Sequence, residues 1–175
     1  MKKIIGIALL IMLCSVMFAE EKMAYIDTDK IMMESPETQE AQTILLNERQ
    51  KWEQEINDMD AEIEQLYSDY ESKKMILTES GKAEAEARIT ELTEQRQAKV
   101  TEIFGENGKF VQKQGELLEP ILKKLQTVIE KVAVENNYTI IFDAAAGGLL
   151  YAKPSLDITD QILDEMTKTV EETGK

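Results

Sequence analysis

The longest regular pattern of apolar residues in the chain is a heptad repeat in its first half. Residues 37–79 contain no glycine or proline, and apolar side chains recur there at alternating intervals of four and three residues. This spacing places them along one face of a helix, as in a coiled coil. The motif Ser35-Pro36-Glu37 is a strong helix start, with Ser35 as the predicted cap. We therefore predict one long helix from this motif to about Leu77, with an apolar seam of Trp52, Ile56, Met59, Ile63, Leu66 and Tyr70.

A second helical pattern follows a break at Thr78-Glu79-Ser80-Gly81. Ser80 is predicted to cap this helix, which would begin near Lys82. Because each seam needs an apolar partner, residues 37–136 are predicted to form an antiparallel coiled-coil hairpin, an arm with its tip near 78–82. The charged Arg96 falls on the second seam and is interpreted as a weak point. The other seam positions are Ala85, Ile89, Leu92, Val100, Ile103, Phe110, Ile121, Leu125, Val128 and Val132.

The lower half of this second helix is predicted to bend. Glycines at 105, 108 and 115 lower helix stability by roughly 1 kcal/mol each relative to alanine. Pro120 lacks a backbone amide hydrogen and should kink or restart the helix.

The two ends of the chain have the shorter patterns of a small α+β body, formed by residues 20–36 and 137–175. Strands are predicted at 23–27, 138–143 and 149–152, with a short helix at 28–34. A last helix, capped by Asp157 or Thr159, runs to about Val170 and has the apolar face Ile158, Ile162, Leu163 and Met166. Three short strands form a poor independent sheet, so the body should oligomerise. The predicted core and oligomer contacts are Tyr25, Ile26, Ile140, Phe142, Leu150, Tyr151, Ile158 and Ile162.

The first 19 residues have the layout of a secretory signal peptide. Lys2 and Lys3 precede an apolar run over 4–18, and cleavage is predicted after Ala19. A permanent membrane anchor is the alternative, but the run is shorter than the roughly 20 apolar residues that span a bilayer. A lipoprotein site at Cys14 is disfavoured because Leu13 stands where a small residue is expected. An exported chain beginning at residue 20 would contain no cysteine.

Composition argues against the common classes of enzyme. The chain has no histidine, and its one cysteine lies in the predicted signal peptide. Nucleophile–base pairs of the usual kinds are therefore missing, and Gly147-Gly148 lacks the lysine and spacing of a phosphate-binding loop. We expect no enzyme activity and no cofactor. Carboxylates such as Asp58 and Asp60 are interpreted as a solvated helix face rather than as metal ligands.

Charge and the arm tip bear on the partners. The chain carries 34 acidic and 20 basic residues, so neither nucleic acid nor anionic membrane is an expected partner. Three consecutive apolar residues, Met75-Ile76-Leu77, cannot all face one seam, so at least one should be exposed near the tip. They are the predicted interaction site, since exposed apolar groups in a charged surface mark interaction sites.

The two ends of the chain together resemble the Skp (OmpH-like) family of periplasmic chaperones. The residues that carry the resemblance are Ala24-Tyr25-Ile26-Asp27, Lys30-Ile31 and Glu34-Ser35-Pro36-Glu37, then Val132-Ala133, Tyr138, Ile140-Ile141-Phe142-Asp143, Leu150-Tyr151 and Asp157-Ile158-Thr159-Asp160. The resemblance implies a trimer held by the β body, and unfolded outer-membrane proteins bound between three projecting arms without ATP. One departure is charge: well-known members are basic, whereas residues 37–79 here contain 12 acidic and 4 basic residues.

The resemblance thus implies an ATP-independent periplasmic holdase that binds unfolded outer-membrane or envelope proteins as its clients, with Met75, Ile76 and Leu77 as the predicted client-binding residues. A periplasmic coiled-coil scaffold or spacer is the alternative. A scaffold would have sustained, complementary heptads and no exposed apolar tip.

Overall fold

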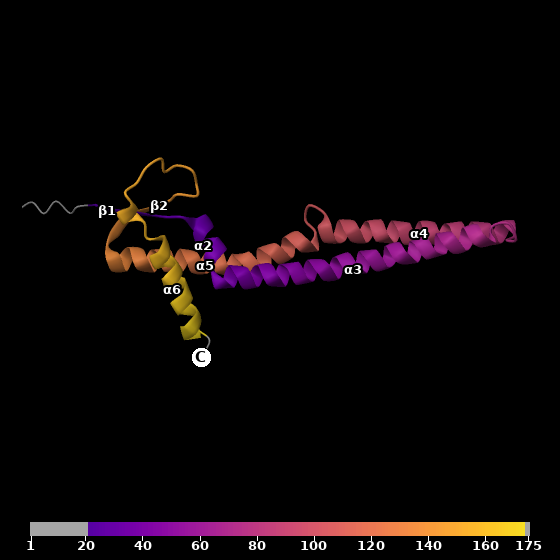
Figure 1. Cartoon of the computed structure of the whole chain (residues 1–175), viewed down its shortest axis with the longest axis horizontal. Coiled ribbons are helices and arrows are strands. Elements are labelled where there is room, and N and C mark those ends of the chain that lie inside the picture. Colours follow the sequence, from indigo (N-terminus) through magenta and orange to yellow (C-terminus); the bar gives the residue numbers. More distant parts are fainter. Residues whose placement is uncertain (1–20, 174–175) are drawn as a thin grey trace, which may run out of the picture.

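The computed structural model describes residues 21–173, which form a small body and one long helical arm (Figure 1). The predicted signal peptide and its cleavage site lie outside the described residues. The arm consists of α3 (Pro36–Lys73), α4 (Glu79–Phe104) and α5 (Lys109–Asn136). Helix α3 has 38 residues and, at 1.5 Å per residue, is roughly 57 Å long. It lies antiparallel to α4 in the outer half of the arm and to α5 near the body, which confirms the predicted hairpin.

The predicted seam forms the contact between α3 and α4. Ile56 and Tyr70 of α3 and Leu92 and Ile103 of α4 are buried, and the remaining apolar positions of the α3 seam are half-buried. Arg96 is not the weak point that the sequence suggested, because its guanidinium donates to both carboxylate oxygens of Asp60, each at 2.9 Å. The outer half of the arm is therefore held by a narrow apolar seam supplemented with polar links.

The helix ends at the tip differ from the prediction. Helix α3 ends at Lys73 rather than near Leu77, and α4 begins at Glu79. The cap of α4 is Thr78, whose hydroxyl accepts from the amide of Gly81 at 3.2 Å, so Ser80 lies inside the helix. At the start of α3, Ser35 occupies the cap position, but its hydroxyl donates to the Glu37 carboxylate and caps no amide.

The second helical pattern of the arm, which returns from the tip to the body, is interrupted where a bend was expected. Residues 105–108 form a loop between α4 and α5. A side chain at Gly105 or Gly108 would place its Cβ 2.4 Å from the carbonyl oxygen of Thr101 or Ile103, respectively. Glycine is thus required by close backbone approach at both positions. Helix α5, in contrast, runs through Pro120 without restarting.

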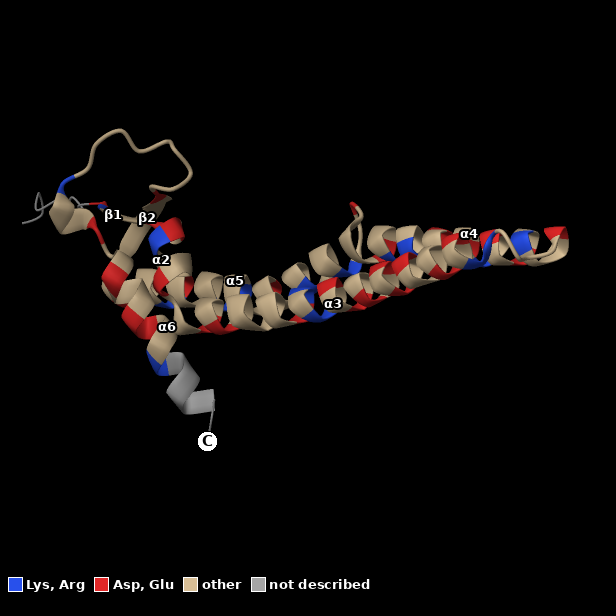
Figure 2. Ribbon diagram, turned by 45° about the vertical axis from the view of Figure 1, so that its right-hand side comes forward, with Lys and Arg blue, Asp and Glu red and all other residues tan. Residues whose placement is uncertain are grey.

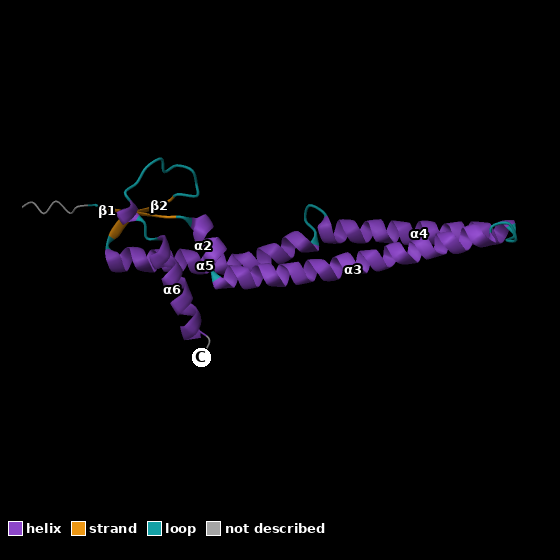
Figure 3. Ribbon diagram, viewed as in Figure 1, coloured by secondary structure: helices purple, strands orange, loops and turns teal. Residues whose placement is uncertain are grey.

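The body contains a two-stranded parallel sheet within the described residues. Strand β1 (Lys22–Ile26) pairs with β2 (Tyr138–Asp143), so that Met23 lies opposite Ile140 and Tyr25 opposite Phe142. The predicted third strand at 149–152 is wrong, because this segment belongs to the irregular loop after β2 (Figure 3). The other side of β1 is occupied instead by the segment before the last helix, where the amide of Ile158 donates to the Tyr25 carbonyl at 3.0 Å.

Three further helical segments complete the body: α2 (Thr28–Glu34), the 3₁₀ turn η1 (Pro154–Leu156) and α6 (Thr159–Thr173). The predicted apolar face of the last helix is confirmed, since Ile162 and Met166 are fully buried. None of the helices that the structure describes is both long and apolar enough to cross a membrane. One apolar core joins the body to the base of the arm and comprises Ala24, Ile26, Ile31, Ala41, Ile121, Leu125, Val128, Val132, Ile158, Ile162 and Met166.

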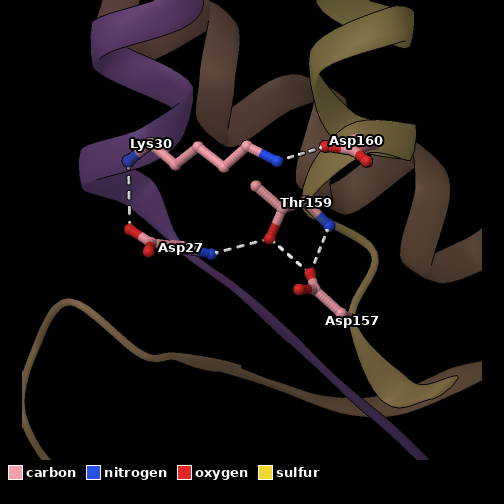
Figure 4. Close-up of polar contacts among 5 residues, drawn as sticks. All are labelled: Asp27, Lys30, Asp157, Thr159 and Asp160. Carbon is pink, nitrogen blue, oxygen red and sulfur yellow. Dashed lines mark hydrogen bonds and ion pairs between the residues drawn. The ribbon is translucent and has the colours of Figure 1, made fainter. Parts of the chain in front are cut away.

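A polar network ties α2 to the start of α6 beside this core (Figure 4). The Thr159 hydroxyl accepts from the Asp27 amide at 3.0 Å and donates to the Asp157 carboxylate. Lys30 forms an ion pair with Asp160 at 2.6 Å. Desolvation raises the pKa of Asp157, but hydrogen bonds from Thr159 and Tyr25 and the charge of Lys30 together hold that pKa below its ordinary value. The network joins two segments that are far apart in the chain, since Asp27 and Thr159 are separated by 132 residues.

Candidate functional site

The tip of the arm presents apolar side chains to solvent. After α3, the Lys73 carbonyl accepts hydrogen bonds from the amides of Ile76 and Leu77, which forms a tight turn. Met75 is 93% exposed and Ile76 is 85% exposed. Leu77 is half-buried, and its Cδ2 lies 3.3 Å from the position of a Cβ on Gly81. The prediction that at least one of the three would be exposed is confirmed for Met75 and Ile76. Leu77 is instead half-buried and lies against Gly81 in the first turn of α4.

The turn is supported by contacts one helical turn below it. The Tyr70 hydroxyl donates to the Glu86 carboxylate and so joins α3 to α4. This hydrogen bond, together with desolvation, raises the pKa of the Tyr70 hydroxyl. The Lys74 ammonium lies 5.2 Å from the centre of the Tyr70 ring and 3.1 Å from the Glu71 carboxylate. Met75 and Ile76 therefore lie at the end of a hairpin whose two helices are joined by a hydrogen bond close to the tip.

The arm around this tip is acidic. Figure 2 shows acidic residues, in red, recurring along α3. Three ion pairs cross from α3 to α4, and in each the carboxylate belongs to α3 and the cation to α4. Their shortest distances are 2.6 Å for Glu55–Lys99, 2.9 Å for Asp60–Arg96 and 3.7 Å for Glu62–Arg88. These pairs engage cations of α4, whereas residues 37–79 alone contain 12 acidic residues. The outer arm therefore has an excess of carboxylates facing solvent.

A second apolar surface lies near the base of the arm and was missed from the sequence. We call it the α5 groove: Val111, Gly115, Leu118 and Leu122 line it on α5, and it continues through Leu118 toward Ala41 and Leu45 of α3. Val111 and Leu122 are exposed. The signal was present, because Val111, Leu118 and Leu122 are spaced seven and four apart, beside the row that forms the core.

The predicted body residues divide into two groups in the single chain. Ile26, Ile158 and Ile162 are buried in the core, and Tyr25 is half-buried. Leu150 and Tyr151 are 97% and 82% exposed, and Ile140 and Phe142 are also exposed. Side chains alternate along a strand, so Met23, Tyr25, Ile140 and Phe142 share the sheet face opposite the core. This face and the loop after β2 give the body an uncovered apolar surface.

No metal site is found among the described side chains, where no group of three or more carboxylates could hold an ion. The carboxylates named in the sequence interpretation serve other contacts. Asp60 binds Arg96, and Asp58 accepts from the Gln54 amide at 2.7 Å.

Comparisons with known proteins extend over nearly all of the described chain. The model of a family described as Outer membrane protein (OmpH-like) matches residues 22–166. An uncharacterized protein of Aquifex aeolicus (strain VF5) is 28% identical over 161 residues, which cover 92% of this chain and 94% of that protein.

The fold has a counterpart among solved structures. A crystal structure of a candidate outer membrane chaperone (OmpH-like) from Caulobacter crescentus CB15 matches with a TM-score of 0.78 and 16% identity. The match covers 87% of this chain and 88% of that one. At this identity, the likeness shows a shared fold of small body and long helical arm.

Proposed function

Because the chain belongs to the OmpH-like family of outer membrane proteins, we propose that it is an ATP-independent holdase that binds unfolded outer-membrane or envelope proteins. The observation that carries the proposal is the apolar tip, where Met75 and Ile76 are almost fully exposed at the end of an arm rich in carboxylates. A coiled-coil spacer gains nothing from two large apolar side chains in solvent, whereas a chaperone needs such groups to contact unfolded chains. The family resemblance and the secretory layout of the first 19 residues support the periplasm as its location.

We propose further that the working form is a trimer assembled through the body. The support is the uncovered apolar face of the sheet with Leu150 and Tyr151 beside it, since an exposed apolar surface of this kind is typical of an interface. A trimer would project three arms from one body and would leave a space between them for the client.

The test is an aggregation assay. A urea-unfolded β-barrel outer-membrane protein is diluted into buffer, and light scattering is followed with and without the purified chain. Protection is expected without ATP and with a chelator present. The variant Met75→Ser, Ile76→Ser should protect several-fold less well, because it removes the apolar contact of the tip. Leu77 is left unchanged because it is half-buried against Gly81 in the first turn of α4.

A matched control separates the tip from general surface change. Met33→Ser alters an exposed methionine of α2 in the body, and this variant should protect as well as the wild type. If the wild-type chain gave no protection at any ratio to client, the holdase proposal would be wrong and the scaffold would be the better interpretation. Equal protection by the tip variant would instead move the client contact to the α5 groove.

A further inference from the structure

Sulfur in the described part of the chain occurs only as methionine thioethers, because the single cysteine is Cys14. Their exposure differs widely. Met75 is 93% exposed, Met33 is 68% exposed and Met166 is 1% exposed. Met32 and Met59 are half-buried. Since oxidants reach an exposed thioether more readily than a buried one, these methionines should be oxidised at very different rates.

Met75 is also the methionine whose chemistry matters most to the proposed client contact. It lies in the turn between α3 and α4, outside both helices and outside the apolar seam. Its neighbour Ile76 is the other exposed apolar side chain of the tip, and Leu77 is half-buried against Gly81. A polar group on Met75 would thus alter the tip surface without removing a contact that stabilises the hairpin.

The reaction is a two-electron oxidation by a peroxide. Hydrogen peroxide transfers one oxygen atom to the thioether sulfur, which gives methionine sulfoxide, and the peroxide is reduced to water. The product is polar and chiral where the reactant was flexible and apolar. Methionine sulfoxide reductases return the thioether, with a thiol as the electron donor, so the change is reversible.

We propose that Met75 is an oxidation site through which peroxide weakens the capture of clients at the arm tip, an inference that rests on the proposed holdase function. Oxidation replaces half of the exposed apolar pair by a polar group. Client affinity should fall roughly tenfold, which corresponds to about 1.4 kcal/mol. The loss is reversed when the sulfoxide is reduced. The reactant at this site is therefore a peroxide, and the effect of the reaction is a lower affinity of the arm tip for an unfolded chain.

The experiment compares the purified wild-type chain with Met75→Leu and Met33→Leu variants, each before and after hydrogen peroxide. Mass spectrometry of peptides gives the order of oxidation, and circular dichroism checks that the helices persist. Binding is measured by fluorescence anisotropy with a labelled, urea-unfolded β-barrel outer-membrane protein. Met75 should oxidise first and Met166 last. Affinity should fall in the wild type and in Met33→Leu, should stay constant in Met75→Leu, and should recover after treatment with a methionine sulfoxide reductase.

Two results would overturn the inference: wild-type binding that is unchanged once Met75 is fully oxidised, or an equal loss of affinity in Met75→Leu. Failure of the holdase proposal is distinguishable, because it appears as absent binding in the untreated samples. Failure of the oxidation inference appears only after peroxide.

Discussion

At the scale of single residues, the ion pairs that join distant segments give the structure a defined response to acid. Glu37, at the start of α3, accepts from Lys124 of α5 and from the hydroxyl of Ser35. Desolvation raises the pKa of Glu37, but the hydrogen bonds from Lys124 and Ser35 outweigh it and hold the pKa below its ordinary value. A carboxyl with a depressed folded-state pKa stabilises the fold above its unfolded-state pKa. That contribution is lost as pH falls through the folded-state value.

The Glu37 pair therefore predicts a loss of stability in acid, which sets in as the pH falls through about 4.3, the pKa of an unfolded glutamate. The free energy of unfolding in urea should be lower at pH 3 than at pH 6, and part of that difference should vanish in Glu37→Gln. Glu40→Gln, at an exposed position one turn further along α3, is the control and should keep the wild-type difference. Equal pH dependence in Glu37→Gln and wild type would contradict the role given to the pair.

At the scale of elements, the break between α4 and α5 is the least regular part of the arm, and two glycines near it behave oppositely. Gly108 is buried, and a Cβ there would lie 2.4 Å from the Ile103 carbonyl oxygen. Gly115 lies inside α5 with nothing within 4 Å of the corresponding position. The same substitution should thus have opposite effects seven residues apart.

Gly108→Ala is expected to destabilise the chain by about 1–3 kcal/mol, because the backbone of the loop would have to move. Gly115→Ala is expected to stabilise it by up to about 1 kcal/mol, since alanine is the better helix former. Unfolding in urea, followed by circular dichroism, measures both. Two changes of the same sign would show that the close backbone contact at Gly108, and its absence at Gly115, do not decide the effect of an added Cβ.

The elements also show which parts of the fold could be predicted from the sequence. Strong periodicity identified the hairpin, its seam and the apolar face of α6, because these depend on spacing alone. Arg96 was misinterpreted because its partner Asp60 lies on another helix, and periodicity within one helix carries no information about that contact. Residues 149–152 have strand composition, but Asp157 and Ile158 occupy the edge of β1. The α5 groove was missed because its apolar residues lie directly beside the core residues of α5. In the sequence, the two sets form one continuous apolar pattern.

At the scale of the whole molecule, the proposed trimer explains why an apolar sheet face is uncovered in the single chain. Phe142→Asp should dissociate the trimer, because assembly would bury an unpaired carboxylate. The chain itself should keep its helices, because Phe142 is exposed within it. Sedimentation equilibrium gives the assembly state and circular dichroism the helix content. Leu46→Asp, on an exposed position of α3, is the matched control and should remain trimeric. A wild-type chain that sediments as a monomer at micromolar concentration would refute the trimer.

The parallel pairing of β1 with β2 has a consequence for how the chain folds. Met23 and Ile140 are ladder neighbours, yet 140 − 23 = 117 residues separate them. Closing so long a flexible loop is slow and costs entropy, whereas α3 and α4 can meet through a short turn. Once the hairpin has formed from its tip toward its base, β1 and β2 lie close together at the base of the arm. Folding of the arm thus promotes pairing of the two strands in the body. An insertion in α3 must therefore be matched by one of equal length in α4 or α5, so that β1 and β2 can still pair.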